Sequence, residues 1–189
     1  MDKELSDEDL MLSYKTGDAA SFETLYQRYK GGLYRYFLRN CKNEGIAEEL
    51  YQDVWMNLIK ASERYEVKAK FTTWLYQMAH NRLIDYYRRQ QTTAAGNPGD
   101  SEMDAEETLA RNQDQPEQKA EILATTETLF GLIEELPADQ KQAFLLREEA
   151  GMGIQEIAEI TGVKPETAKS RLRYAVNKLR EGLREYEPG

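Results

Sequence analysis

A basic segment near the C-terminus carries side-chain types that bind nucleic acid. Residues 164–184 hold seven Lys or Arg side chains against two Glu side chains, although the whole chain of 189 residues has a net charge of −9. Such local asymmetry points to nucleic acid even in an acidic protein. The candidate DNA-binding residues, on the outward face of a predicted helix, are Lys164, Thr167, Lys169, Ser170, Arg171 and Arg173.

The sequence around this segment predicts a helix-turn-helix. GIQEIAEITGVKPETAKSRLRYAVNKLR reads as a short helix, a turn at Gly162, and a longer helix from Pro165 to about Tyr186. The inward stripe of the longer helix consists of Ala168, Leu172, Val176 and Leu179. Its N-terminal residues would reach base edges in the major groove, and later Lys and Arg would bind phosphates. The alternative is a solvated basic helix, but the compact EIAEITG turn favours DNA binding.

A second segment, FTTWLYQMAHNRLIDYYRR at residues 71–89, places basic, amide and aromatic groups on one helical face. Rings stack on bases, amides read base edges and Arg binds phosphate, so this face suits a single strand. Its candidate residues are Tyr76, Gln77, His80, Asn81, Asp85, Arg88 and Arg89. The opposite, core-facing stripe consists of Phe71, Leu75, Met78, Ala79 and Leu83. Trp74 and most Tyr residues are assigned to the core, because large aromatic side chains are usually buried.

Helical periodicity covers most of the chain, and strand patterns are almost absent, which predicts an all-α protein. Residues 1–92 form one predicted domain of four helices, and residues 121–189 form a second domain that contains the helix-turn-helix. The intervening residues 93–120 are acidic and lack aromatic residues, which predicts a flexible linker.

The composition argues against several classes of protein. A single cysteine, Cys41, leaves no disulfide framework, and a single histidine leaves no zinc cluster. No catalytic set is recognisable, so we expect no enzyme activity, no metal and no cofactor. The chain shows neither a membrane-length apolar run nor a secretory signal, which predicts a soluble cytoplasmic protein.

Taken together, the two halves resemble an extracytoplasmic-function (ECF) sigma factor of bacterial RNA polymerase. The blocks that carry the resemblance are FETLYQRYKGGLYRYFLR, AEELYQDVWMNLIKA, FTTWLYQMAHNRLIDYYRR and ETAKSRLRYAVNKLR, in that order. The resemblance implies that residues 1–92 are sigma domain 2, which binds core polymerase and the −10 promoter element. It implies that residues 121–189 are sigma domain 4, which binds the −35 element and the flap of the β subunit.

The resemblance also assigns roles to individual residues. The block at 47–61 would dock on the clamp helices of the β′ subunit through Glu49, Gln52, Asp53, Trp55 and Met56. A flipped −10 base would enter a pocket formed by the loop Ala61–Lys70 and by the face that bears Asn81, Asp85 and Arg88. His80 departs from the family pattern, in which a short apolar residue is common. Family members are usually held inactive by an anti-sigma factor, often a membrane protein, in stress responses.

One alternative stays open at this level. EIAEITGVKPETAKSRL alone would also fit a helix-turn-helix regulator that binds duplex DNA without polymerase. The helical first 90 residues argue against it, since they contain no βα phosphoacceptor pattern. No small-molecule substrate is expected for either function.

Overall fold

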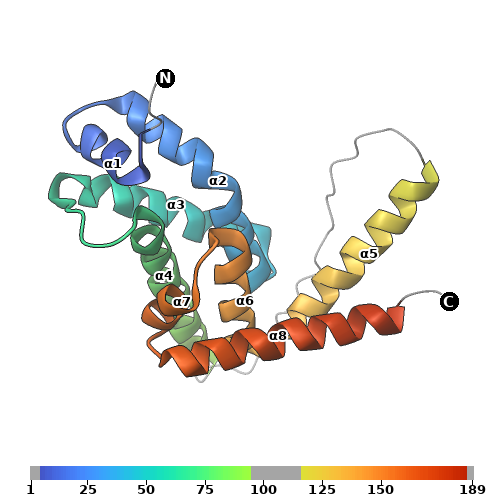
Figure 1. Cartoon of the computed structure of the whole chain (residues 1–189). Coiled ribbons are helices and arrows are strands. Elements are labelled where there is room, and N and C mark those ends of the chain that lie inside the picture. The colour runs from blue at the N-terminus through green and yellow to red at the C-terminus, as the bar shows by residue number, and fades with distance from the viewer. Residues whose placement is uncertain (1–4, 95–115, 187–189) are drawn as a thin grey trace.

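The computed structural model describes residues 5–94 and 116–186, and the regular elements in these ranges are helices (Figure 1). They are α1 (Asp7–Lys15), α2 (Ala19–Cys41), α3 (Glu44–Ala61), the short 3-10 helix η1 (Ser62–Arg64), α4 (Phe71–Ala94), α5 (Pro116–Glu134), α6 (Ala138–Ala150), α7 (Ile154–Thr161) and α8 (Pro165–Tyr186). The all-α prediction is therefore confirmed for the described residues. We call α1–α4 the N-terminal bundle and α5–α8 the C-terminal bundle.

The first helices begin at side-chain caps. Ser6 Oγ accepts a hydrogen bond of 3.1 Å from the N–H three residues on, and Asp18 Oδ1 accepts one of 3.1 Å from the N–H two residues on. Each cap satisfies an N–H that has no partner inside its helix. The sequence predicts that α3 follows Gly45, but the helix begins at Glu44, because the Asn43 side chain caps it.

Aromatic rings fill much of the N-terminal bundle. Tyr36, Phe37 and Phe71 are fully buried, and Trp55 packs edge-on against Phe22 with ring centroids 5.9 Å apart. Each such ring removes a large apolar area from water, and edge-to-face pairs add a further favourable contact. These rings hold α2, α3 and α4 together, so the exposed face of α4 is carried on a well-packed core.

The C-terminal bundle is built around α8. Ala168 and Ala175 are fully buried, and their small side chains allow α8 to pack closely on α6 and α7. Gly182 lies against α5, where a Cβ atom on it would come within 2.4 Å of Leu132 Cδ2. The α5 and α8 helices consequently form an arm that extends away from the N-terminal bundle (Figure 1).

Most of the predicted acidic linker, residues 93–120, lies outside the described residues, so its flexibility stays a prediction. At its near end, α4 continues to Ala94, beyond the expected stop near Arg89. At its far end, α5 begins at Pro116, so the start of this helix falls inside the predicted linker range. Proline suits a first helical turn, since its fixed φ and missing N–H cost nothing there.

The two bundles are packed against each other. In sequence they are separated by residues 95–115, yet α2 contacts α6 and α5, and α4 contacts α7 and α6 (Figure 1). Gln142 of α6 is buried at this junction, with hydrogen bonds into α2. The arrangement of the bundles decides which candidate functional residues face solvent.

Candidate nucleic-acid interface

The helix-turn-helix is formed by α7, a tight turn and α8. Gly162 ends α7 with φ +67°, a left-handed conformation that favours glycine, and its N–H bonds back to the carbonyl oxygens of α7. The turn exposes the first residues of α8, and Lys164, Thr167 and Lys169 all face solvent. Ser170 is half-buried. These four residues lie at the N-terminal end of the longer helix of the motif.

Two arginines of the same helix have partners within the protein. Arg171 forms an ion pair with Asp139 of α6, with 2.6 Å between its Nη2 and Asp139 Oδ2, so only part of its side chain is exposed. Arg173 is exposed, and its guanidinium lies over the ring of Tyr174, 5.2 Å from the ring centroid. Arg171 therefore already holds a fixed orientation, whereas Arg173 has only a ring contact.

The second candidate surface, on α4, is exposed over much of its length. Asn81, Asp85, Arg88 and Arg89 face solvent, while Gln77 is half-buried and donates a 3.2 Å hydrogen bond to Asn81 Oδ1. Arg88 and Asp85 approach each other to 3.9 Å, which is a weak contact between exposed groups. Amide and guanidinium groups thus lie on the solvent side of α4.

Tyr76 departs from the prediction that it lies on the exposed face of α4. Its side chain is fully buried, and its hydroxyl donates a 3.2 Å hydrogen bond to the carbonyl oxygen of Glu149 at the end of α6. The sequence-based assignment is wrong on this point because α6 covers this part of α4. Burial also raises the pKa of the Tyr76 hydroxyl, so the group is a neutral donor.

His80 is half-buried at the same junction. Its Nδ1 lies 3.5 Å from the Tyr36 hydroxyl, which itself donates to Gln142 Oε1 at 2.7 Å. Removal from water lowers the pKa of His80, and a hydrogen bond with Gln142 opposes that shift in part. In this arrangement His80 is an uncharged contact residue between the bundles.

A cavity of about 330 Å³ opens between the 61–70 loop and α4. Tyr65, Trp74 and Gln77 contribute to its walls, together with Glu159 from α7 of the other bundle. Trp74, which the sequence assigns to the core, is half-buried and forms part of this wall. No local pattern could reveal Glu159, since it reaches the cavity only through the packing of the two bundles.

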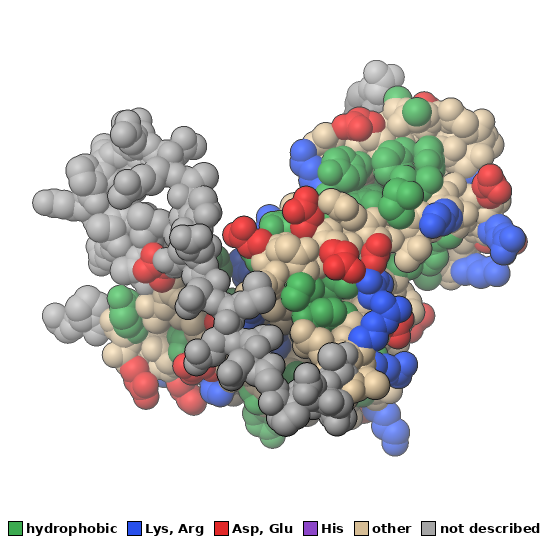
Figure 2. Space-filling view, turned by 180° about the vertical axis from the view of Figure 1, so that it is seen from behind, with side chains coloured by type: hydrophobic (Ala, Val, Ile, Leu, Met, Phe, Trp, Pro, Cys, Tyr) green, Lys and Arg blue, Asp and Glu red, His purple; other side chains and the backbone are tan. Residues whose placement is uncertain are grey.

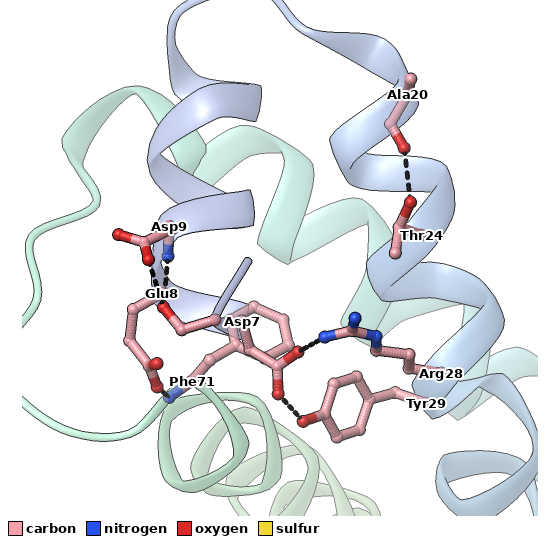
Figure 3. Close-up of polar contacts among 9 residues, drawn as sticks. Asp7, Glu8, Asp9, Ala20, Thr24, Arg28, Tyr29 and Phe71 are labelled. Carbon is pink, nitrogen blue, oxygen red and sulfur yellow. Dashed lines mark hydrogen bonds and ion pairs between the residues drawn. The ribbon is translucent and has the colours of Figure 1, made fainter. Parts of the chain in front are cut away.

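Helix α1 holds the 61–70 loop at its middle and at the residue that follows it. Lys15 Nζ donates a 2.8 Å hydrogen bond to the carbonyl oxygen of Tyr65. After the loop, Glu8 Oε1 accepts a 2.7 Å hydrogen bond from the N–H of Phe71 and so caps α4 (Figure 3). Asp7 joins α1 to α2 through Arg28 in the same region (Figure 3). Sequence reasoning missed these positioning residues, because their partners lie on other helices.

A third candidate surface lies on α3. Glu49, Gln52 and Met56 are exposed, and Met56 retains 52% of its accessible surface, a high value for a large apolar side chain. Hydrophobic side chains gather on the part of the molecule formed by the N-terminal bundle (Figure 2). Asp53 is half-buried, where its Oδ2 pairs with Arg82 of α4 at 2.6 Å. Trp55 is 5% exposed, so it supports this surface from beneath rather than lying alongside the exposed residues as predicted.

Within residues 5–94 and 116–186, no group of three or more His, Cys, Asp or Glu side chains is arranged to bind a metal ion. A search of the same residues finds no helix with the length and apolar character to span a lipid bilayer.

Comparison with known proteins assigns both halves of the chain. The family model described as sigma-70 region 2 matches residues 25–93, and the one described as sigma-70, region 4 matches residues 127–179. The RNA polymerase sigma factor CarQ of Myxococcus xanthus is 27% identical over 94% of this chain and 97% of its own length. The ECF RNA polymerase sigma-E factor of Haemophilus influenzae is 29% identical over 91% of this chain and 92% of its own. This chain belongs to the ECF family of sigma factors.

The fold agrees with that assignment. The sigma factor RpoE from Bartonella quintana, solved in complex with the anti-sigma factor NepR, superimposes with a TM-score of 0.70 at 21% identity. The matched region covers 86% of this chain and 96% of RpoE. In this ECF sigma factor, all of α4 but its last residue falls within the region 2 match, and most of α8 falls within the region 4 match. The predicted family and fold are confirmed.

Proposed function

We propose that this ECF sigma factor directs core RNA polymerase to promoters by reading two DNA elements with two separate surfaces. The observation that carries this proposal is the pairing of a helix-turn-helix in one bundle with a polar helix face beside a cavity in the other. A recognition helix suits duplex DNA, whereas a cavity next to aromatic and amide groups suits an unstacked base. The two surfaces together fit recognition combined with strand opening.

The −35 element would be bound by the start of α8. Lys164, Thr167, Lys169 and Ser170 lie on its solvent side, with the exposed Arg173 further along. The ion pair with Asp139 keeps Arg171 pre-oriented, which lowers the entropy lost on contact with DNA.

The −10 element would be bound by α4 and the 61–70 loop. The cavity of about 330 Å³ lies at the lower end of the size range for small-ligand sites, so it suits one flipped base better than a stack of bases. Trp74 in its wall offers a partly exposed ring, and Asn81 and Arg88 lie on the exposed face of the same helix. Flipping costs a few kcal/mol per base, which stacking and hydrogen bonds in the cavity would offset.

Core polymerase would be bound by α3. The exposed Met56 supplies an apolar contact, and Glu49, Gln52 and Asp53 surround it with polar groups. The Arg82 guanidinium, 2.6 Å from Asp53 and 3.6 Å from Glu49, holds the two carboxylates in a fixed relation. An apolar centre with a polar rim is the usual anatomy of a protein interface.

An anti-sigma factor would complete the set of partners. RpoE of Bartonella quintana, which shares this fold, was solved with the anti-sigma factor NepR. We extend such control to this chain and place the protein in the cytoplasm, where its polymerase and promoter partners are.

Run-off transcription with core polymerase and a promoter library tests the proposed function. We expect transcripts only when this chain is added, and the selected promoters should share two elements. Lys169→Ala should weaken use of the −35 element, and Asn81→Ala should weaken use of the −10 element. Strong specific binding to duplex DNA without polymerase, with no stimulation of transcription, would instead support the helix-turn-helix regulator.

A further inference from the structure

One large aromatic side chain lies in solvent in the middle of α8. Tyr174 retains 53% of its accessible surface, whereas the other apolar side chains of the helix from Pro165 to Leu183 are buried or half-buried. The packing of the C-terminal bundle therefore does not explain the ring. A single exposed tyrosine is common at protein surfaces, so its position on the helix decides what it can do.

Helical geometry places Tyr174 on the same face as two of the candidate −35 residues. It follows Thr167 by seven residues, which is within about 20° of two full turns, and it follows Ser170 by about one turn. One turn further on, Lys178 Nζ donates a 3.2 Å hydrogen bond to the carbonyl oxygen of Glu135 at the end of α5. Tyr174 is thus the last large side chain of this face before Lys178 ties α8 to α5.

The two arginines near Tyr174 have different partners. The Arg171 guanidinium is paired with Asp139 at 2.6 Å, within the bundle. The Arg173 guanidinium lies over the Tyr174 ring, 5.2 Å from its centroid, where the negative face of the ring attracts the cation. Arg173 therefore takes one face of the ring, and the rest of the exposed surface consists of aromatic C–H groups and the hydroxyl.

The chemistry of the major groove narrows what such a ring can contact. The base edges there carry hydrogen-bond donors and acceptors, together with one apolar group, the C5-methyl of thymine. Thr167 and Ser170 can bond with donors and acceptors, and a cation such as Arg173 suits phosphate. A ring with mainly apolar exposed surface matches the thymine methyl group.

We propose that Tyr174 is a specificity-determining residue for the −35 element: its ring packs on the methyl group of one thymine while Arg173 binds a neighbouring phosphate. The inference rests on the proposed function and names a base that its −35 surface reads. Thr167 and Tyr174 are about 10 Å apart along the helix axis, which equals about three base-pair steps of 3.4 Å. For a helix lying along the groove, the thymine lies about three base pairs from the pair that Thr167 contacts.

A promoter selection with holoenzyme tests the assignment position by position. The wild type should select a T·A pair at one −35 position that Tyr174→Ala no longer selects, with the rest of the element unchanged. Tyr174→Phe should keep the preference, since the ring rather than the hydroxyl makes the contact. Tyr186→Ala is the matched control, because it removes a second exposed tyrosine, 47% exposed, from the far end of the same helix.

Two results of this selection would overturn the inference. One is an unchanged −35 preference in Tyr174→Ala, and the other is an equal weakening at every −35 position. Thr167→Ala gives the register, because it should relax a different position, about three base pairs away. If both variants relax the same position, the ring does not lie where the inference puts it.

Uracil, which is thymine without the methyl group, tests the contact at a single chemical group. Holoenzyme is titrated with the selected duplex carrying either thymine or uracil at the assigned position. The wild type and Tyr174→Phe should bind the uracil duplex about three- to fivefold more weakly, as expected when one methyl group leaves an apolar contact. Tyr174→Ala should bind both duplexes equally. Equal losses in the wild type and Tyr174→Ala would assign the methyl group to another side chain and overturn the inference.

Failure of the proposed function has a different signature. If wild-type holoenzyme initiates from no template, the −35 surface has no role, and the inference about Tyr174 fails with it. If wild-type holoenzyme initiates but its −35 element requires no thymine, the proposed function stands and only the assignment of Tyr174 is overturned.

Discussion

The two candidate DNA surfaces differ in what covers them. The start of α8 is open to solvent, and its main internal contact, Arg171 with Asp139, lies within its own bundle. The α4 surface is divided: Asn81 and Arg88 are exposed, but Tyr76 lies under a helix of the other bundle. The difference shows that availability for DNA is set by bundle packing as well as by the sequence of the helix. The start of α8 is thus open to solvent, whereas the α4 surface is open only in part.

Thiol reactivity should show the largest difference between the interior of the N-terminal bundle and the open side of α8. Cys41, at the end of α2, is half-buried, and removal from water raises its pKa to about 12. An exposed thiol has a pKa near 8.5, so at pH 8 the reactive thiolate of Cys41 should be about three orders of magnitude scarcer. Iodoacetamide labelling of the wild type should be slower by about that factor than labelling of Cys41→Ala/Asn177→Cys, in which the thiol is placed on the exposed side of α8.

Comparable labelling rates for the two proteins would contradict this prediction. Labelling of Cys41→Ala alone serves as the control, because that variant has no thiol.

Loss of the buried network should have the next largest effect. Gln142→Leu keeps a similar volume but removes the donor to Asn40 Oδ1 and leaves the Tyr36 hydroxyl with only its 3.5 Å contact to His80, and an unsatisfied buried group costs about 1–3 kcal/mol. We expect urea denaturation to report a loss of roughly 2–3 kcal/mol, together with a larger radius of gyration. Gln155→Leu, at an exposed position of α7, is the control and should change neither measurement. Equal stability of the two variants would mean that the buried network contributes nothing to the stability of the folded chain.

The salt dependence of DNA binding should separate the open surface from the rest of the molecule. Lys164 and Lys169 are exposed, and each proposed phosphate contact contributes about one unit to the slope of log affinity against log salt. The double variant Lys164→Ala/Lys169→Ala in holoenzyme should therefore lower that slope by about two on a −35 duplex. Lys60→Ala, at the exposed end of α3, should leave the slope unchanged. An unaltered slope in the double variant would remove these lysines from the DNA contact.

Features that depend on neighbouring residues could be predicted from the sequence. The turn at Gly162 was identified because it needs only a backbone conformation within a few positions of the chain. The same local signals located the recognition helix and most of the polar face of α4. They also revealed the family, since its motifs are local blocks in a fixed order.

Features that depend on distant packing were missed. Tyr76 was expected on an exposed face because helical periodicity cannot show that α6, 73 residues away in the chain, supplies a carbonyl acceptor for its hydroxyl. Trp55 was expected alongside the exposed residues of α3, but the rings of Phe22 and Tyr26 cover it. Glu159 was given no role, although it lines the cavity. In each case the deciding partner lies on another helix.

The pH dependence of the stability of the chain should be the smallest effect, and it tests His80. The groups that face its ring are the Tyr36 hydroxyl and the Gln142 side chain, and neither carries a charge that would stabilise imidazolium. Burial lowers the pKa of His80 in the folded chain. Below about pH 6.5 the unfolded chain therefore binds more protons than the folded chain. Stability is therefore full above about pH 6.5 and declines as the pH falls below it.

Urea denaturation at pH 7.5 and pH 5.5 measures this dependence, with His80→Gln as the comparison. Glutamine can keep a hydrogen bond to Tyr36 but cannot be protonated, so its stability should fall less between the two pH values than that of the wild type. Carboxylates elsewhere in the chain also titrate towards pH 5.5, and they contribute equally to both proteins. The difference between the proteins thus isolates His80. Identical losses of stability in the two proteins would show that His80 is not held neutral at the junction. The contact between the bundles would then depend on the ion pairs and on Gln142.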